Sequence, residues 1–198
     1  MITFYWSLIT VHYKLFTMNI SKYFHNLSFE IKALLFDWGD TVMKVLPEQT
    51  GPMALWTEVA AVEGTQEILP LLKEKYKIVL VSNALDSDKN HVLHALERVS
   101  LAEYFHKIFT PQELKEQKPA PNFYLNILKQ IAVEPEHAIM IGDNYEKDII
   151  AAKQVGLWTI WYNPKKQQLT ENSYPYHDAE VNHLLKLNTI IQGTMKLK

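Results

Sequence analysis

The sequence predicts an α/β fold, in which a mainly parallel sheet carries helices on both faces and so forms a three-layer sandwich. Three short apolar runs carry this prediction, because each ends in small polar or acidic residues; they cover residues 31–36, 77–81 and 138–141. A near-continuous apolar run is typical of a parallel strand that is buried on both faces. Segments with helical spacing lie between these runs, and such alternation favours a parallel sheet.

The other elements follow from local signals. Pro121 suits the first turn of a helix, and Gly156 suits a helix end. Pro70 conflicts with a helix over residues 65–75, because an interior proline costs about 3 kcal/mol or more; we therefore expect a kink or a later helix start. The further elements that we expect are strands at 107–110 and 159–162, helices at 65–75, 89–99, 121–131, 145–155 and 181–191, and a short helix at 54–61.

Composition limits the class of protein. The 198 residues suffice for one domain with a sizeable core. A formal net charge of −2 gives no basic footprint for nucleic acid. The chain has no cysteine, which excludes disulfides and thiol catalysis and is compatible with a cytoplasmic location.

Residues 1–28 are expected to lie outside the main domain, which covers residues 29–198. Residues 1–11 are apolar and aromatic, but they are far fewer than the ~20 residues that a spanning helix needs. They also lack a basic segment and a clear cleavage site, so we expect neither a membrane span nor a signal peptide. Met18 offers an alternative start, and the segment is expected to be poorly ordered or to pack as an added piece.

Functional side chains are expected where the three strands end. Asp37, Ser82 and Asp143 come at or directly after the apolar runs, and Lys118 stands before a Pro-x-Pro sequence. Ligands bind beyond the carboxyl ends of the strands in an open α/β sheet. Carboxylates suit a hard cation such as Mg²⁺, and a hydroxyl and an ammonium group suit phosphate oxygens. The alternative for Asp37 is an ordinary polar turn.

These segments together resemble the haloacid dehalogenase (HAD) superfamily of phosphohydrolases, from Ile31 to the C-terminal region. All four motifs of that family occur in order: residues 37–41, Ser82, Lys118 with Lys-Pro-x-Pro, and Gly142-Asp143 with Asp148. The resemblance implies a Rossmann-like fold. A response-regulator receiver is the nearest rival, but it places its acid pair first and its phosphoacceptor aspartate on a later strand, so the order does not fit.

The resemblance implies a role for each motif residue. Asp37 would be the nucleophile that forms an aspartyl-phosphate, and Lys118 would neutralise the attacking carboxylate and the phosphate. Ser82 and the backbone of Asn83 would bind a phosphate oxygen. The implied Mg²⁺ ligands are Asp37, the backbone carbonyl of Gly39, Asp143 and, as a supporting acid, Asp148.

Each of these roles has a plain structural alternative. Asp143 would otherwise cap the following helix. Asp148 would be an acid favoured by the dipole at a helix start. Lys118 would be a surface lysine.

One position departs from the family pattern. The family places a second aspartate, the general acid and base, two residues after the nucleophile, but this chain has Gly39 there and Asp40 in place of the usual glycine. Proton transfer of this kind contributes roughly 10²–10⁴-fold. Three interpretations stay open: Asp40 or a water replaces the missing acid, the leaving group needs no acid, or the protein is a weak or inactive binder.

The spacing of the motifs predicts that no full cap domain covers the site. Asp37 and Ser82 are 45 residues apart, and Ser82 and Lys118 are 36 apart. One flap-like hairpin and a helix fill most of the first gap, and a helix, a strand and a connection fill the second. A capless protein of this kind has an open site. It would take a macromolecular phosphate, hold its substrate with residues 42–64, or borrow a cap from an oligomeric partner.

Two other candidates carry less weight. His91 and His94 lie three residues apart on an expected helix, but no third metal ligand is evident. Trp38, beside the nucleophile, would stack on a substrate or pack near the mouth of the site. We therefore interpret the chain as a Mg²⁺-dependent phosphomonoester phosphatase whose partner is a phosphorylated substrate. The alternative is a HAD-fold module that binds a phosphorylated ligand or a protein.

Overall fold

The computed structural model describes residues 30–169 and 175–194. The described residues from Ile31 onwards form one compact unit, and the expected extension 1–28 lies outside the described residues. None of the described helices is long and apolar enough to cross a membrane.

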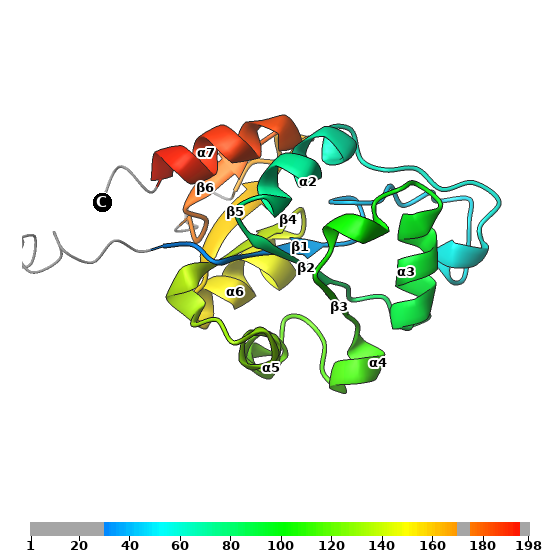
Figure 1. The fold of residues 1–198 in the computed structure, drawn as a ribbon, viewed down its shortest axis with the longest axis horizontal. Helices are drawn as coiled ribbons and strands as arrows, with labels where there is room; N and C mark the ends of the chain where they lie inside the picture. Colours follow the sequence, from blue (N-terminus) through cyan, green and yellow to red (C-terminus); the bar gives the residue numbers. More distant parts are fainter. Residues whose placement is uncertain (1–29, 170–174, 195–198) are drawn as a thin grey trace, which may run out of the picture. The chain divides into compact units, whose positions relative to one another are not determined.

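The centre of this unit is a six-stranded sheet in which every pair of neighbouring strands is parallel (Figure 1). Its order is β3-β2-β1-β4-β5-β6, so β1 lies between β2 and β4. The strands are β1 (Ala33–Asp37), β2 (Lys77–Val81), β3 (Lys107–Phe109), β4 (Ala138–Gly142), β5 (Trp158–Tyr162) and β6 (Ala179–Val181). The predicted parallel α/β fold is confirmed; β6, a three-residue edge strand, was not predicted.

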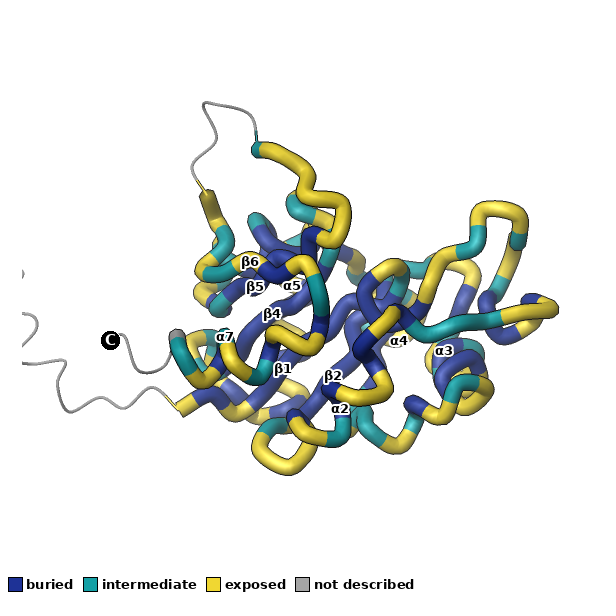
Figure 2. Tube along the Cα trace, turned by 90° about the horizontal axis from the view of Figure 1, so that it is seen from above, coloured by how far each residue is buried: buried dark blue, intermediate teal, exposed yellow. Residues whose placement is uncertain are grey.

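Helices cover both faces of the sheet because side chains alternate along each strand. Leu34 and Phe36 of β1 join one core cluster, and Ala33 and Leu35 join the other. The first cluster packs under α2 (Thr65–Lys73), α3 (Lys89–Glu97) and α7 (Leu187–Thr194), and the second under α5 (Pro121–Ile131) and α6 (Ala151–Gln154). Figure 2 shows the strands as the buried centre between these layers.

Several expected boundaries are wrong. α2 begins at Thr65 despite Pro70, since the proline removes one N–H whose partner would be the carbonyl of the exposed Gln66. The helix expected at 145–155 is confirmed within one residue, but its first part, Tyr145–Ile150, is a π-helix, which α6 continues. The helix expected from residue 181 follows β6 instead, as a 3₁₀ turn at Leu184–Lys186 and then α7. The one-turn helix α4 (Pro111–Leu114) was not expected.

Residues 42–64, called the insert from here on, lie where the first motif gap was expected to hold a flap. The Lys44 N–H donates to the Ala60 carbonyl (2.8 Å) and the Val62 N–H to the Val42 carbonyl (2.9 Å), which closes an antiparallel pairing. The helix expected at 54–61 is wrong, because only Met53–Leu55 form a 3₁₀ turn and the backbone after it is extended to make this pairing. No domain-sized cap occurs among the described residues of the insert.

Arg98, at the end of α3, holds the tip of the insert. Its guanidinium donates to three backbone carbonyls, those of Ala54 (3.2 Å), Trp56 (2.6 Å) and Thr57 (3.0 Å). Arginine suits this task because its donors form a rigid fork. The insert is therefore fixed to the helix layer by one side chain.

We expect Arg98→Lys to lower the free energy of unfolding by about 1.5 kcal/mol, because one ammonium group cannot serve three carbonyls. Urea unfolding measures the loss, and limited proteolysis should show faster cleavage between residues 45 and 60. Lys89→Gln, which removes a charge from the exposed start of the same helix, is the matched control and should change neither. Equal unfolding curves for Arg98→Lys and the parent chain would contradict the prediction.

Candidate active site

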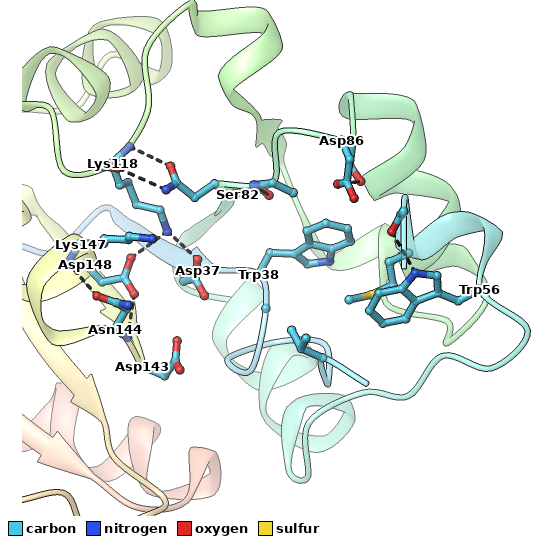
Figure 3. Close-up of a pocket in the computed structure, with 17 residues that line it drawn as sticks. Asp37, Trp38, Trp56, Ser82, Asp86, Lys118, Asp143, Asn144, Lys147 and Asp148 are labelled. Atoms are coloured by element: carbon cyan, nitrogen blue, oxygen red, sulfur yellow. Dashed lines mark hydrogen bonds and ion pairs between the residues drawn. The ribbon is translucent and has the colours of Figure 1, made fainter. Parts of the chain in front are cut away.

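Three strand ends bring the predicted side chains together. Asp37 ends β1, Ser82 follows β2, and Asp143 follows β4; these strands are neighbours, so their carboxyl ends meet at one edge. The close-up in Figure 3 shows Asp37 between Lys118 on one side and Asp143 on the other. The strand pattern therefore located these side chains at the edge of the sheet where the structure places them.

Lys118 is the centre of the charged cluster. Only 2% of this residue is exposed, which excludes the alternative of a surface lysine. Its Nζ lies 2.5 Å from Asp37 Oδ1 and 2.7 Å from Asp148 Oδ1. Burial alone lowers the pKa of Lys118, but the charges of Asp148 and Asp37 outweigh it and raise this pKa above its ordinary value. The ammonium group therefore stays charged and ties both carboxylates to one point.

Asp148 is buried, and it also lies in the first turn of the π-helix, the position that the structural alternative gave it. It is 1% exposed, and burial followed by the charge of Asp37 raises its pKa against the opposing effect of Lys118. A Cβ on Gly142 would lie 2.3 Å from Asp148 Oδ2, so only glycine lets this carboxylate approach the end of β4. Asp148 Oδ2 also accepts the N–H of Asn144 (3.1 Å).

Asp143 is held through its backbone. Its N–H donates to the Thr41 hydroxyl (3.1 Å), and its carbonyl accepts the indole N–H of Trp161 (3.0 Å). Burial, followed by the charges of Asp37 and Asp40, raises the pKa of Asp143 to about 6. The loop between β4 and the π-helix thus places a partly buried carboxylate where it could bind a cation.

The donor set fits a divalent cation. Asp37, Asp143 and Asp148 each offer a carboxylate oxygen, and these atoms lie within 4.8 Å of one another. Mg²⁺ favours such oxygens at about 2.1 Å. Three carboxylates and one ammonium group leave a net charge of −2, which one divalent cation offsets. Burial is the main cause of the raised pKa values of Asp143 and Asp148, and the charges of the neighbouring carboxylates raise them further.

Asn83 holds the lysine loop with its side chain. Its Oδ1 accepts the N–H of Lys118 (2.8 Å), and its Nδ2 donates to the Lys118 carbonyl (3.2 Å). The Ser82 hydroxyl accepts the N–H of Ala84 (3.0 Å), and Ser82 is buried at the floor of the site. This two-point contact was not predicted, since nothing in the spacing of residues 83 and 118 indicates it.

Asp40 lies outside the pocket that Asp37 lines. Its backbone is left-handed (φ 55), a conformation that aspartate tolerates better than most residues. Its Oδ1 accepts the N–H of Val45 (3.0 Å), and it lines a second pocket of about 190 Å³ with Lys44 and Tyr162. The geometry therefore does not favour Asp40 as the replacement for the missing acid at Gly39.

The two histidines do not form a metal site. The His91 side chain accepts the Asp88 N–H (3.4 Å), and Asp88 accepts the His91 N–H (2.8 Å), which makes a capping box for α3. Among the described residues, only the three aspartates group as potential metal ligands.

The pocket at the strand ends has a volume of about 290 Å³. The predicted site residues line it, together with others that the sequence did not single out. Lys147, from the π-helix, lies at the charged end. Met53 and Trp56 come from the insert, and Asp86 from the loop after β2. The insert was expected as one way of holding the substrate, but no signal singled out Met53 or Trp56 within it, and none pointed to Asp86 or Lys147.

This arrangement of acids, hydroxyl and lysine agrees with the comparison to protein families. The profile described as "Haloacid dehalogenase-like hydrolase" matches residues 13–162. The chain belongs to this family. The match covers the four motifs and the five strands from β1 to β5.

The curated relatives with similar sequences include several phosphatases. A pyrimidine 5'-nucleotidase of Streptococcus pneumoniae is 32% identical over 58% of this chain and 51% of its own length. An N-acylneuraminate-9-phosphatase of Rattus norvegicus is 28% identical over 66% and 52%. A glyceraldehyde 3-phosphate phosphatase of Pyrococcus furiosus is 28% identical over 69% and 57%. The chain spans about half the length of these relatives.

Solved structures share the fold. An uncharacterized protein of Listeria monocytogenes superposes with a TM-score of 0.75 at 22% identity, over 84% of this chain and 99% of that one. A HAD phosphatase of Thermococcus onnurineus gives 0.67 at 20% identity, over 82% and 99%.

Asp143→Asn should stabilise the metal-free protein at pH 7.5. The pKa of Asp143 is raised on folding, so its ionised form opposes folding above pH 6, and the opposition disappears as the pH falls to 4. Because Asp143 is partly exposed, solvent screens its charge, and we expect the variant's free energy of unfolding to exceed the parent's by about 1–2 kcal/mol at pH 7.5. Chemical unfolding of parent and variant in EDTA, from pH 4 to 7.5, measures the difference.

Saturating Mg²⁺ provides the control for this experiment. A cation that binds the folded parent stabilises it by mass action, so it should remove or reverse the advantage of the variant. A variant that is less stable than the parent at pH 7.5 in EDTA would show that the ionised Asp143 does not destabilise the folded protein.

Proposed function

We propose that this chain is a Mg²⁺-dependent phosphomonoester phosphatase that acts through an aspartyl-phosphate on Asp37. The observation that carries the proposal is the position of Asp37. Its carboxylate is at the end of the central strand, faces a pocket, and contacts a buried ammonium group beside two further acids. A phosphatase of this type needs a nucleophile, a cation for the phosphate and ligands for a metal, and all three converge here.

Each side chain has a task in this proposal. Asp37 attacks phosphorus with its free oxygen, while Lys118 holds the other oxygen (2.5 Å) and offsets the charge of the phosphoryl group. Ser82 and the backbone of Asn83 bind a phosphate oxygen. Asp148 keeps Lys118 aimed at the site (2.7 Å).

Asp37, Asp143, Asp148 and the backbone carbonyl of Gly39 would hold the Mg²⁺. When bound, the ion supplies positive charge that stabilises the phosphoryl group in the transition state.

Proton transfer is the weak point of this site. Attack by Asp37 breaks the bond between phosphorus and the leaving oxygen, which must take a proton, and hydrolysis of the aspartyl-phosphate requires a water to lose one. Gly39 cannot serve as the acid or the base, and Asp40 contacts Val45 rather than the pocket. Water then carries the protons, which favours substrates whose leaving group departs as a stable anion.

The relatives indicate the class of substrate. Their names refer to a pyrimidine nucleotide, an N-acylneuraminate phosphate and a glyceraldehyde phosphate, all small phosphorylated molecules. A pocket of about 290 Å³ accommodates a molecule of this size. Small phosphorylated metabolites and the lack of cysteine both suit a cytoplasmic location.

We expect slow, Mg²⁺-dependent release of phosphate from p-nitrophenyl phosphate, and a loss of this activity with EDTA. Asp37→Asn should reduce the rate to background, because the amide is not a nucleophile. Glu146→Gln, an exposed acid of the same helix as Asp148, is the matched control and should retain the parent rate. Binding of phosphate compounds without any turnover by the parent would favour the alternative, a phosphoryl-ligand-binding module.

The double variant Gly39→Asp/Asp40→Gly restores the family order and should raise turnover of alkyl phosphates by up to ~10²–10⁴-fold, and that of aryl phosphates much less. A glycine at position 40 would suit the left-handed backbone there (φ 55), and the new Cβ at position 39 would meet only the half-exposed Val45 at 3.0 Å.

The single variant Asp40→Gly separates the two effects in the same kinetic assay. It should leave the rate on both substrates unchanged if Asp40 carries no proton. A strong loss on alkyl phosphates in this variant would assign the general acid to Asp40 after all.

A further inference from the structure

Two cationic side chains line the pocket at the strand ends, and both lie at the end that holds Asp37. Among the described residues that line this pocket, Lys118 and Lys147 are the only lysines, and no arginine lines it. The opposite end carries the acid Asp86 instead (Figure 3). The anionic part of a ligand is therefore attracted to one end of the pocket, where two ammonium groups differ in what they contact.

The ammonium group of Lys118 is largely committed to carboxylates. An ammonium group has three N–H donors, and Lys118 directs two of them to Asp37 (2.5 Å) and Asp148 (2.7 Å). Its positive charge, together with that of one divalent cation, would balance the three carboxylates of the site. A phosphomonoester, which is close to a dianion at pH 7, would then bring negative charge that this cluster does not offset.

Lys147 has a free ammonium group at the same end. The residue is exposed and lines the pocket, and its side chain makes no ion pair or hydrogen bond with the part of the chain that the structure describes. Figure 3 shows it next to Asp148, on the same side of the pocket as Lys118. All of its N–H donors are thus available to a ligand.

The backbone of Lys147 is held in place before any ligand binds. Its N–H donates to Asn144 Oδ1 (3.0 Å), and its carbonyl accepts the hydroxyl of Tyr124 (2.7 Å), a buried residue of α5. The next residue is Asp148, which contacts Lys118 (2.7 Å). These contacts fix the point at which the side chain leaves the π-helix. A ligand therefore has only the side chain of Lys147 to order, which lowers the entropic cost of binding.

We propose, resting on the proposed function, that Lys147 binds the phosphoryl group of the substrate and that the hydroxyl of Tyr124 positions it for this task. Lysine is a compact charge that suits phosphate oxygens. Lys118 is buried and shared with two carboxylates, whereas Lys147 reaches the phosphoryl group from the pocket wall with a charge that no carboxylate takes. The second lysine thus supplies the positive charge that the buried cluster lacks.

Calorimetric titration of inorganic phosphate into the full chain with Mg²⁺ tests this assignment without any turnover. Lys147→Gln should weaken phosphate binding at least ~10-fold relative to the parent, because charge-assisted hydrogen bonds to phosphate are strong. Lys147→Arg keeps the charge and should stay within about threefold of the parent. Equal affinities of the parent and Lys147→Gln would overturn the proposal.

The same titration separates this inference from the proposed function. If the parent hydrolyses no phosphomonoester but its phosphate affinity depends on Lys147, the phosphatase activity is wrong and the role of Lys147 in binding stands. A parent chain that binds no phosphate would contradict both.

Lys44→Gln is the matched control for the loss of one positive charge. Lys44 is exposed and lines the second pocket, which shares Asp143 with the pocket at the strand ends but not Lys147. Because salt and solvent screen such a charge, this variant should change the phosphate affinity less than about twofold. A loss as large as that of Lys147→Gln would indicate a general effect of charge instead of a contact, and would overturn the proposal.

Tyr124→Phe tests the positioning role, because it removes only the hydroxyl that holds the Lys147 carbonyl. It should weaken phosphate binding about threefold in the parent and leave it unchanged in the Lys147→Gln variant, where no ammonium group remains to be positioned. Equal weakening in both backgrounds would show that Tyr124 does not act through Lys147. Reduced stability with an unchanged phosphate affinity would likewise assign Tyr124 to the fold alone.

Discussion

The buried ammonium group of Lys118 is the interaction on which the site depends. It lies between the carboxylates of Asp37 and Asp148, which come from different elements of the fold. Desolvation makes a lone buried charge very unfavourable, and removing one partner of a buried pair typically costs about 3–5 kcal/mol. These ion pairs therefore couple the positions of three segments: the loop with Lys118, the end of β1 and the π-helix. Displacing one of them would leave a buried charge unpaired. The side-chain amide of Asn83 adds a fourth element, the loop after β2, through its two bonds to the lysine backbone.

This cluster also explains two local features that look unfavourable by themselves. Gly142 weakens a strand in principle, yet any side chain there would occupy the place of Asp148. The π-helix at Tyr145–Ile150 is a rare conformation that occurs frequently at functional sites. Here it carries Asp148 towards Lys118 and leaves Lys147 at the pocket wall. Gly142 and the π-helix are each locally less stable than the usual alternative, but both are needed to bring Asp148 to Lys118.

The sequence was informative wherever a signal is local. Buried strands have apolar runs, so β1, β2 and β4 were predicted within one or two residues, and the acids that follow them were found with them. The short edge strand β6 and the bridge between Met43 and Ala61 have no such signal, because their pairing depends on partners far along the chain. For the same reason Asp86, Lys147 and Trp56 were not identified as pocket residues. Their positions relative to Asp37 follow from how the insert, the loop after β2 and the π-helix fold.

Arg98 attaches the insert through backbone atoms, and this bears on how the side chains of the insert could change between related proteins. Its three bonds go to backbone carbonyls, those of residues 54, 56 and 57, and to no side chain of the insert. Every amino acid provides the same carbonyl, so the side chains of this segment can be exchanged while its attachment to α3 persists. Anchoring and recognition are thereby separated: a lineage could acquire a new substrate by changing positions 53 and 56 without having to rebuild the wall that carries them.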